Sequence, residues 1–558
     1  MSAGAPTTLN YPDTSMAVLP ASMAALYGDR AAVVDGDTTL TYAELDARSA
    51  AVASALRSAG VAERDVVLIY LTNSIEFVVS YYGSLRAGVT VTLVNPLQPI
   101  PGLHRQIVET GAVAGFTQVE QSDRLLSAAA DSPLSTVVVV DGSADPVEGV
   151  RVEGVRVEGV RVTSLDEFVV GHSEAPAVTV TTEDVAHLAF TGGTTGVSKG
   201  VRVLHRNVLG NATQMIGWRA GHAIEVGDDG LLRLTPRPGS DRGVVPGGAA
   251  TVVVSPLFHA HALINMTFLL LCGATHVLAG RFEPGRMLAL IEQYRASYVT
   301  GSPAMWHALA VHPDVESRDL TSVRVVSSGA APIDLVTLEQ LEKAFPAAAI
   351  IEGYGLTEAT CLVSSAPLTA EGQYRLGSVG LPTFDTEVEI RAAHDPTVVL
   401  PAGERGQLWV RGPQVTDGYL GHPEKTAEQF VDGWLDTGDI AFRDEDGYIY
   451  ICDRAKDMLI YKGYNVYPRE LEEILVTHPD IAAAAVVGRE AGPIGQEPVA
   501  FLVPKDGHVV DEDAVAAFVA EQVLPYKKIR DVVVVEELPT SAAGKIQKVA
   551  LRERLTHA

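Results

Sequence analysis

Hydrophobic and polar residues follow one another along the N-terminal part of the chain in periods that predict alternating strands and helices. Thr41 and Glu44 have the spacing of a helix capping box, so a helix is predicted directly after them. The apolar run 66–71, the helical pattern 74–86 and the apolar run 89–94 predict a strand, a helix and a second strand. Two strands joined by a helix pair in parallel through a right-handed crossover. The predicted fold class is therefore α/β, with a large N-terminal domain of mixed and parallel sheets flanked by helices.

The C-terminal part of the chain carries a different pattern. Residues 447–452 alternate like a strand and run into a charged join at 453–457. A helix is predicted from Pro468 and a further strand at 482–487. We therefore expect two domains, one spanning residues 1–453 and a small α+β domain spanning residues 454–558, which is an ordinary size for a domain.

Composition and charge narrow the classes of function. The 558 residues include 42 Lys and Arg against 69 Asp and Glu, a formal net charge of −27, which argues against a protein that binds nucleic acid or an anionic membrane through its overall field. The uncharged run between Arg242 and Arg281 is interrupted by Pro256 and His259, so no membrane span is predicted. The three cysteines are too scattered for a disulfide framework or a zinc cluster, and we expect a cytoplasmic protein.

A segment rich in Gly and Thr predicts a phosphate-binding loop. It follows the apolar run 186–190, and its glycines let backbone N–H groups converge on one anion while the threonines add hydroxyl donors. Lys199 adds a point charge, although its spacing from Gly196 and the glycine after it differ from a Walker A loop. The candidate phosphate-binding residues are Thr191, Gly192, Gly193, Thr194, Thr195, Gly196 and Lys199.

This segment resembles the phosphate loop of the adenylate-forming superfamily, which includes acyl-CoA synthetases, luciferases and adenylation domains. Four further segments resemble the other motifs of that superfamily and occur in the same order. They are an adenine and magnesium motif at 353–358, a ribose motif at 434–439, a hinge region at 453–470 and a catalytic-lysine loop at 539–545. The agreement in order makes the resemblance specific, and it implies that the C-terminal domain is mobile.

The resemblance implies a nucleotide site assembled from several motifs. Asp439 would accept hydrogen bonds from the ribose hydroxyls, and Arg454 would donate to the sugar or to a phosphate. Glu358 and Thr195 would hold Mg²⁺, for which oxygen ligands are suited. The other residues implied to bind the nucleotide are Gly329, Ala330, Ala331, Glu352, Gly353, Tyr354, Gly355 and Thr357.

The resemblance also implies the catalytic residues. Lys545 lies in a Ser-Ala-Ala-Gly loop and would bridge the substrate carboxylate and the α-phosphate, where charge builds up in the transition state. Thr357 and Glu358 would act at the nucleotide phosphates, and His259 would form a gate between the acyl pocket and the nucleotide.

A moving C-terminal domain and a coenzyme A site complete what the resemblance implies. Lys456 is the expected hinge, because an exposed polar residue absorbs a backbone rotation without disturbing a core. Lys462, Gly463 and Tyr464 would bind coenzyme A, with the glycine letting its thiol-bearing arm pass close to the backbone. No carrier segment is recognised after Lys545, so we expect the acceptor to arrive separately.

The residues around the expected acyl pocket favour one class of substrate. Relatives that activate amino acids carry an aspartate directly after the phenylalanine, where this chain has His259, so an α-amino acid is disfavoured. Phe258, Met305 and Trp306 favour a bulky hydrophobic carboxylate, although each of them is also a typical core residue.

We therefore expect an ATP-dependent, AMP-forming acyl-CoA synthetase that uses ATP, Mg²⁺ and coenzyme A. Two alternatives stay open: an acyl-AMP ligase that passes the acyl group to a discrete acyl carrier protein, and a non-catalytic acyl- or nucleotide-binding protein. The oligomeric state also stays open, a homodimer included.

Overall fold

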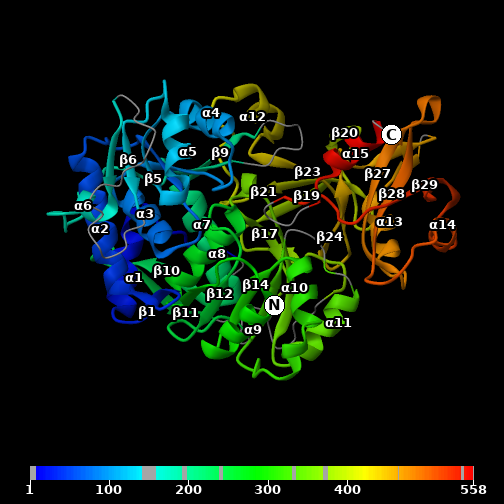
Figure 1. The fold of residues 1–558 in the computed structure, drawn as a ribbon, viewed down its shortest axis with the longest axis horizontal. Coiled ribbons are helices and arrows are strands. Elements are labelled where there is room, and N and C mark those ends of the chain that lie inside the picture. Colours follow the sequence, from blue (N-terminus) through cyan, green and yellow to red (C-terminus); the bar gives the residue numbers. More distant parts are fainter. Residues whose placement is uncertain are drawn as a thin grey trace.

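The structure is a computed structural model. It describes residues 8–140, 159–190, 198–237, 243–329, 333, 335–368, 375–462, 464–541 and 546–556. Figure 1 shows a large body built from the blue to yellow part of the chain and a smaller orange and red body beside it. The predicted α/β fold class is confirmed.

A seven-stranded sheet organises the first part of the large body. Strands β3 and β4 pair in parallel, with Val66 opposite Thr90, and helix α3 (Ile75–Arg86) connects them. The predicted crossover is therefore confirmed, as is the capping box of α2 (Tyr42–Ser58), in which Thr41 and Glu44 bond reciprocally. In spatial order the strands are β7 (Arg161–Ser164), β6 (Thr136–Val139), β5 (Ala112–Thr117), β3 (Val66–Tyr70), β4 (Thr90–Leu93), β8 (Val185–Phe190) and β9 (Gly200–Leu204). Helices α4 (Ile100–Thr110), α5 (Val119–Ala129) and α6 (Leu165–Phe168) belong to the same part.

Two further sheets follow in the large body. In the five-stranded sheet, β14, β15 and β16 are parallel, so their carboxyl ends meet at one edge, where ligands bind in open α/β sheets. Its strands are β14 (Tyr298–Gly301), β15 (Val325–Ser328), β16 (Ala349–Gly355), β17 (Leu362–Ser365) and β18 (Leu381–Pro382). The four-stranded sheet is β12 (Ala250–Val253), β13 (Thr275–Leu278), β1 (Ala31–Asp35) and β2 (Thr38–Thr41). Helices α9 (Pro284–Gln293), α10 (Pro303–Ala310) and α11 (Leu335–Ala344) lie between these strands in the chain.

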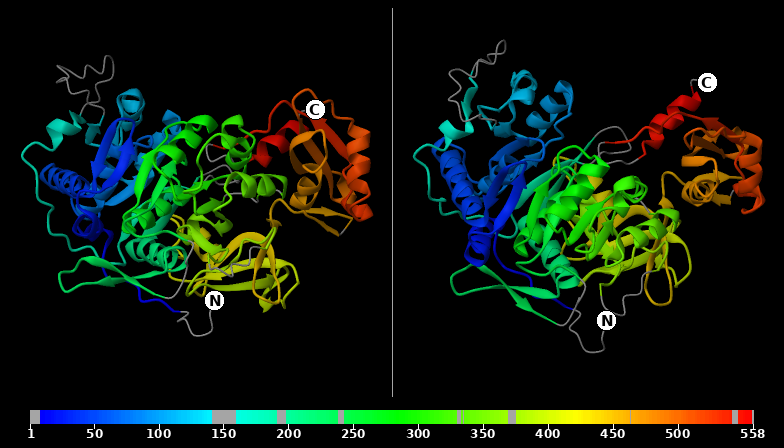
Figure 2. Two further views of the ribbon diagram at one scale, coloured as in Figure 1. Left: turned by 90° about the horizontal axis from the view of Figure 1, so that it is seen from below. Right: turned by 60° about the horizontal axis from the view of Figure 1, so that its bottom comes forward.

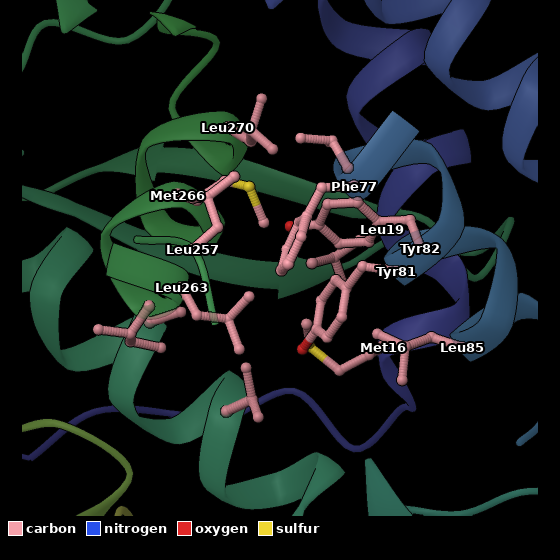
Figure 3. Close-up of a cluster of buried hydrophobic side chains, with 14 of the residues drawn as sticks. Met16, Leu19, Phe77, Tyr81, Tyr82, Leu85, Leu257, Leu263, Met266 and Leu270 are labelled. Carbon is pink, nitrogen blue, oxygen red and sulfur yellow. The ribbon is translucent and has the colours of Figure 1, made fainter. Parts of the chain in front are cut away.

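Buried helices fill the interior between these sheets. Helix α8 (Ala260–Leu271) is buried over nearly its whole length, and α7 (His205–Arg219) is buried along all its faces. Figure 3 shows Phe77 and Tyr81 of α3 facing Leu263 and Met266 of α8. In the described ranges, no helix has both the length and the apolarity that a membrane span requires.

The last part of the large body along the chain is an antiparallel sheet. Strands β23 (Trp434–Arg443) and β24 (Ile449–Arg454) pair so that Asp439 lies opposite Arg454. The other strands are β20 (Asp395–Val399), β19 (Glu387–Ala392), β21 (Gly406–Arg411) and β22 (Phe430–Val431), with α12 (Pro423–Gln429) before the last. The hairpin of β10 (His222–Val226) and β11 (Leu232–Pro236) projects from the body, as both views in Figure 2 show.

The smaller body has a core of its own. Strands β27 (Ile481–Glu490), β28 (Gln496–Pro504) and β29 (Asp531–Val534) form its sheet, and β25 (Leu459–Tyr461) pairs with β26 (Tyr464–Val466). The predicted helix begins at Pro468, as α13 (Pro468–Leu475), and α14 (Glu512–Ala520) and α15 (Lys548–Thr556) follow. The boundary between residues 453 and 454 stays a prediction.

Candidate active site

Several residues predicted for the site lie outside the described residues. They are Thr191, Gly192, Gly193, Thr194, Thr195, Gly196, Ala330, Ala331, Gly463 and Lys545. Their predicted roles stay predictions, and the description below concerns the described residues.

Asp439 is the centre of a buried polar cluster at the predicted ribose site. Its carboxylate is almost completely buried. It accepts a hydrogen bond of 2.5 Å from the Tyr354 hydroxyl and forms an ion pair with Arg454, whose Nε lies 2.8 Å away. Burial, with the nearby Asp439 charge, raises the pKa of Tyr354, and Asp439 raises the pKa of Arg454. Tyr354 is therefore neutral and Arg454 charged at pH 7. Each carboxylate oxygen keeps a second acceptor site for a ligand hydroxyl.

Glu358 is held by a residue that the sequence analysis missed. The hydroxyl of Tyr419 donates a hydrogen bond of 2.8 Å to Oε1 of Glu358, and Nζ of Lys199 lies 4.5 Å from the centre of the Tyr419 ring. Burial, followed by the Glu358 charge, raises the pKa of Tyr419. Thr416 fixes the same segment by donating to the Glu358 carbonyl at 2.9 Å. The position of Tyr419 in a glycine-flanked turn is the one sequence signal that marks it.

Of two glycines near Glu352, Gly355 is required by the close backbone packing, whereas a Cβ at Gly329 would make only an ordinary contact. A Cβ on Gly355 would lie 1.6 Å from the carbonyl oxygen of Cys361, so no other residue fits without moving the backbone. A Cβ on Gly329 would lie 3.5 Å from Nε2 of His261. Glu352 is buried and accepts from the Ile333 amide at 3.0 Å, which ties the end of β16 to the segment after β15. Thr357 begins a short 3-10 turn next to Glu358.

His259 lies at the N-cap of α8 with Phe258 beside it. The two rings are 4.4 Å apart, and the buried Nε2 of His259 has no hydrogen-bond partner in the described part of the chain. Burial lowers the pKa of His259, so the imidazole is neutral at pH 7. A neutral ring with a free nitrogen fits the predicted gate, which stays a prediction.

The structure does not bring the three predicted acyl-pocket residues into one cluster. Trp306 is 0% exposed and packs, with Met305 against it, in the apolar cluster next to β14 and β15. Phe258 packs against the other large cluster, around α3 and α8. Trp306 therefore has no accessible surface in this arrangement, and it contributes to the core.

The predicted hinge and coenzyme A residues lie on the small β25–β26 hairpin and before it. Lys462 has a positive φ of 52° at the hairpin tip, and its Nζ lies 5.2 Å from the centre of the Tyr461 ring. Tyr464 is 56% exposed and stacks on Tyr526 at 4.6 Å. Lys456 lies two residues after the end of β24 at Arg454.

The donor set suits a magnesium ion that is bound mainly by phosphates. Among the described residues, no group of three or more His, Cys, Asp or Glu side chains is arranged to hold a metal ion. Glu358 offers one carboxylate, and Mg²⁺ commonly binds one or two carboxylates together with substrate phosphates. The residues present therefore fit a metal that enters with the nucleotide.

The comparisons with known proteins agree with this geometry. The family described as AMP-binding enzyme matches residues 21–420, and the AMP-binding enzyme C-terminal domain matches residues 470–545. The chain is 34% identical over 538 residues to 4-coumarate-CoA ligase 1 of Narcissus pseudonarcissus, covering 95% of this chain and 91% of that one. It is 35% identical over 524 residues to 4-coumarate--CoA ligase-like 4 of Oryza sativa subsp. japonica, covering 92% and 88%.

A solved structure with the same fold is ATP-bound MatB from Rhodopseudomonas palustris. It has a TM-score of 0.82 and 26% identity, and covers 96% of this chain and 98% of that one. The predicted resemblance and the predicted enzyme class are confirmed. This protein is an AMP-forming acid–thiol ligase that uses ATP, Mg²⁺ and coenzyme A, and the chain belongs to the AMP-binding enzyme family.

Proposed function

We propose that this ligase activates a bulky, largely apolar carboxylic acid, with aryl acids as the leading class, and transfers it to coenzyme A. In the first half-reaction a carboxylate oxygen attacks the α-phosphorus of ATP and the bond to pyrophosphate breaks. In the second half-reaction the thiol sulfur attacks the acyl carbon, AMP leaves and the thiol proton passes to solvent. Making the adenylate first creates a good leaving group before the thioester forms.

The observation that carries the substrate class is the neutral, apolar entrance to α8. His259 is neutral, stands beside Phe258 and makes no ion pair with a described carboxylate, so nothing there is suited to hold a substrate ammonium. Helix α8 behind it is buried and mainly apolar, with His261, Asn265 and Thr267 as its polar residues. The relatives are named as ligases of 4-coumarate, which supports an aryl acid.

The described residues take the following roles in this proposal. Asp439 and Arg454 would hold the ribose, and Glu358, positioned by Tyr419, would hold an Mg²⁺ ion, which would supply charge screening of the phosphates. Lys199 lies next to Tyr419 and would contact the same phosphates. Lys545 stabilises the charge that builds up at the α-phosphorus.

The C-terminal domain is proposed to take two orientations. Rotation at Lys456 would carry Lys545 to the nucleotide for the first half-reaction and would present Lys462, Gly463 and Tyr464 to coenzyme A for the second. Domains 1–453 and 454–558 are the proposed units of this motion. The cytoplasmic location stays a proposal, which the three free cysteines support.

Acid-dependent AMP release tests this function. The panel is 4-coumarate, cinnamate, benzoate, decanoate and phenylalanine, with coenzyme A present, and the thioester is identified by mass. We expect turnover of the aryl acids and none of phenylalanine. Turnover of phenylalanine alone would refute the substrate class. Acyl-adenylate formation without a thioester, followed by transfer to an added acyl carrier protein, would refute coenzyme A as the acceptor.

A further inference from the structure

Arg219 is a buried cation without a counter-charge among the described residues. It is the last residue of α7 and only 2% exposed. Its guanidinium donates to the Tyr298 hydroxyl and lies 3.5 Å from Oγ of Ser365, while its buried Nε has no hydrogen-bond partner in the part of the chain that the structure describes. No described carboxylate forms an ion pair with it. Arg86, by contrast, has Asp46 at 2.6 Å, which is the usual arrangement for a largely buried arginine.

The groups around Arg219 do not supply the missing negative charge. Burial raises the pKa of Tyr298, and it raises the pKa of Cys361 to about 12. Burial also lowers the pKa of His261 to about 4, with the Arg219 charge contributing. These three groups are therefore neutral at pH 7, whereas a guanidinium is always protonated. The Tyr298 ring, 5.7 Å from the guanidinium carbon, and the C-terminal end of α7 offset the charge in part.

Arg219 lies beside the proposed ligand site. A Cβ on Gly353 would lie 3.6 Å from Nη2 of Arg219, and a Cβ on Gly329 would lie 3.9 Å from the Gly353 carbonyl oxygen. The two glycines are neighbours at the carboxyl edge of β15 and β16, and neither places a side chain in front of Arg219 or His261. One turn after His261, the buried Oδ1 of Asn265 has no partner among the residues that are described, so the polar groups on this side keep unused hydrogen-bonding capacity.

We propose that Arg219 determines substrate specificity by binding a second carboxylate, carried at the far end of the acid that is activated. The proposal rests on the function proposed above and narrows it to apolar, aryl-type acids with a distal carboxylate. A planar guanidinium binds a carboxylate through two parallel hydrogen bonds. Within the described ranges Nε has no partner and Nη2 has only a long contact with Ser365, so this pair of donors keeps unused hydrogen-bonding capacity. Binding the second carboxylate supplies the counter-charge that the described residues do not provide.

Matched pairs of acids test the proposal on the full-length enzyme. The pairs are terephthalate with benzoate and 4-carboxycinnamate with cinnamate, and kcat/KM is measured by AMP release for the wild type, Arg219→Met and Arg219→Lys. We expect the wild type to prefer each diacid by at least about tenfold, and Arg219→Met to lose at least about tenfold on the diacid through KM while the monoacid is unchanged. Arg219→Lys keeps the charge but loses the fork, so an intermediate loss is expected.

Arg86→Met is the control for loss of a structural arginine. We expect it to lower the melting temperature and to leave the ratio of diacid to monoacid unchanged, because it breaks an ion pair with Asp46. Arg219→Met should not lower the melting temperature of the ligand-free enzyme, because it removes a charge that has no partner.

Two results would overturn the proposal in distinguishable ways. Equal turnover of monoacid and diacid, with Arg219→Met and Arg219→Lys reducing both alike, makes Arg219 structural and leaves the proposed function standing. Absence of turnover with all four acids refutes the proposed aryl class and the distal-carboxylate inference together. If Arg219→Met does not fold, the diacid-to-monoacid ratio of Arg219→Lys decides.

Discussion

The hydroxyl of Tyr419 donates a 2.8 Å hydrogen bond to Oε1 of Glu358, and the same ring lies under the ammonium of Lys199. One aromatic side chain thus fixes the proposed magnesium ligand and contacts the lysine that follows the predicted phosphate loop. Lys199 and Glu358, which belong to the two parts of the proposed phosphate site, are 159 residues apart in the sequence. Tyr419 contacts both of them.

Tyr419→Phe removes the hydrogen bond and keeps the ring. A hydrogen bond to a charged group contributes about 1.5–3 kcal/mol, so we expect the KM for MgATP to rise by about tenfold or more with the lysine contact retained. Steady-state kinetics at varied Mg²⁺ and ATP measure the effect. Tyr11→Phe is the control, because Tyr11 makes a 2.6 Å bond to Asp385 away from the phosphate residues. An equal change in both variants would contradict the role of Tyr419.

Asp439→Asn tests the proposed ribose site. The change removes the charge that Arg454 contacts at 2.8 Å and leaves a half-buried guanidinium without its partner. We expect a loss of about 1–3 kcal/mol in unfolding free energy, measured in urea, together with weaker AMP binding by calorimetry. Asp46→Asn breaks a similar ion pair, with Arg86, and should affect stability alone. Unchanged AMP affinity in Asp439→Asn would remove Asp439 from the site.

Lys545→Ala separates the two half-reactions. We expect the rate of adenylate formation to fall at least about a hundredfold, since a charge that stabilises the transition state is lost. Pyrophosphate exchange measures this rate. Thioester formation from a supplied acyl-adenylate should continue, because the lysine is proposed to act in the first step alone. Lys505→Ala, at an exposed loop lysine, is the control. Undiminished exchange in Lys545→Ala would refute the proposed catalytic lysine.

Buried histidines make the fold sensitive to acid. Burial lowers the pKa of His187 to about 3 and the pKa of three further histidines to about 4; these are His205, His261 and His276. The unfolded chain takes up protons below about pH 6.5, whereas the folded chain does not until about pH 4, so stability is lost as the pH falls through this window. Each histidine contributes a slope of about 1.4 kcal/mol per pH unit.

His205→Asn tests this acid sensitivity. Nδ1 of His205 accepts a hydrogen bond from the Met16 amide at 3.1 Å, and the asparagine oxygen is a possible replacement acceptor. Urea unfolding at several pH values between 4.5 and 6.5 should show a shallower slope in this variant by about 1.4 kcal/mol per pH unit. The exposed His394→Asn should leave the slope as it is in the wild type. A slope unaltered in both variants would contradict the assignment.

Local signals in the sequence predicted local structure well. The capping box at Thr41 and the unit of β3, α3 and β4 are formed by residues close in sequence, so their periodicity was sufficient. The motifs also predicted that Asp439 and Arg454 belong to one site, which the register of β23 and β24 brings together. Strand β24 extends to Arg454, beyond the predicted end at residue 452, because pairing with β23 continues into the charged join.

Contacts between distant segments were not predictable from the same signals. The Tyr419 contact with Glu358 and the position of Arg219 against Tyr298 depend on how three sheets pack, which no local period encodes. Trp306 shows the same limit, and its place in the acyl pocket stays a prediction. An aromatic residue near the expected pocket was a candidate for ligand contact, yet its ring is enclosed beneath Gly301.

Adjacent residues at the end of β24 are tied to opposite sides of the join. Arg454 contacts Asp439 of β23, whereas Oδ2 of Asp453 accepts a 3.0 Å hydrogen bond from the Arg469 amide in α13. If the backbone rotates on the N-terminal side of this pair, the contact between Arg454 and Asp439 must break. If it rotates on the C-terminal side, the hydrogen bond between Arg469 and Asp453 must break. Each rotation therefore has to break one contact before it can begin. A nucleotide that competes for Asp439 would weaken only the contact with Arg454, so the bound ligand would decide on which side of the pair the backbone rotates.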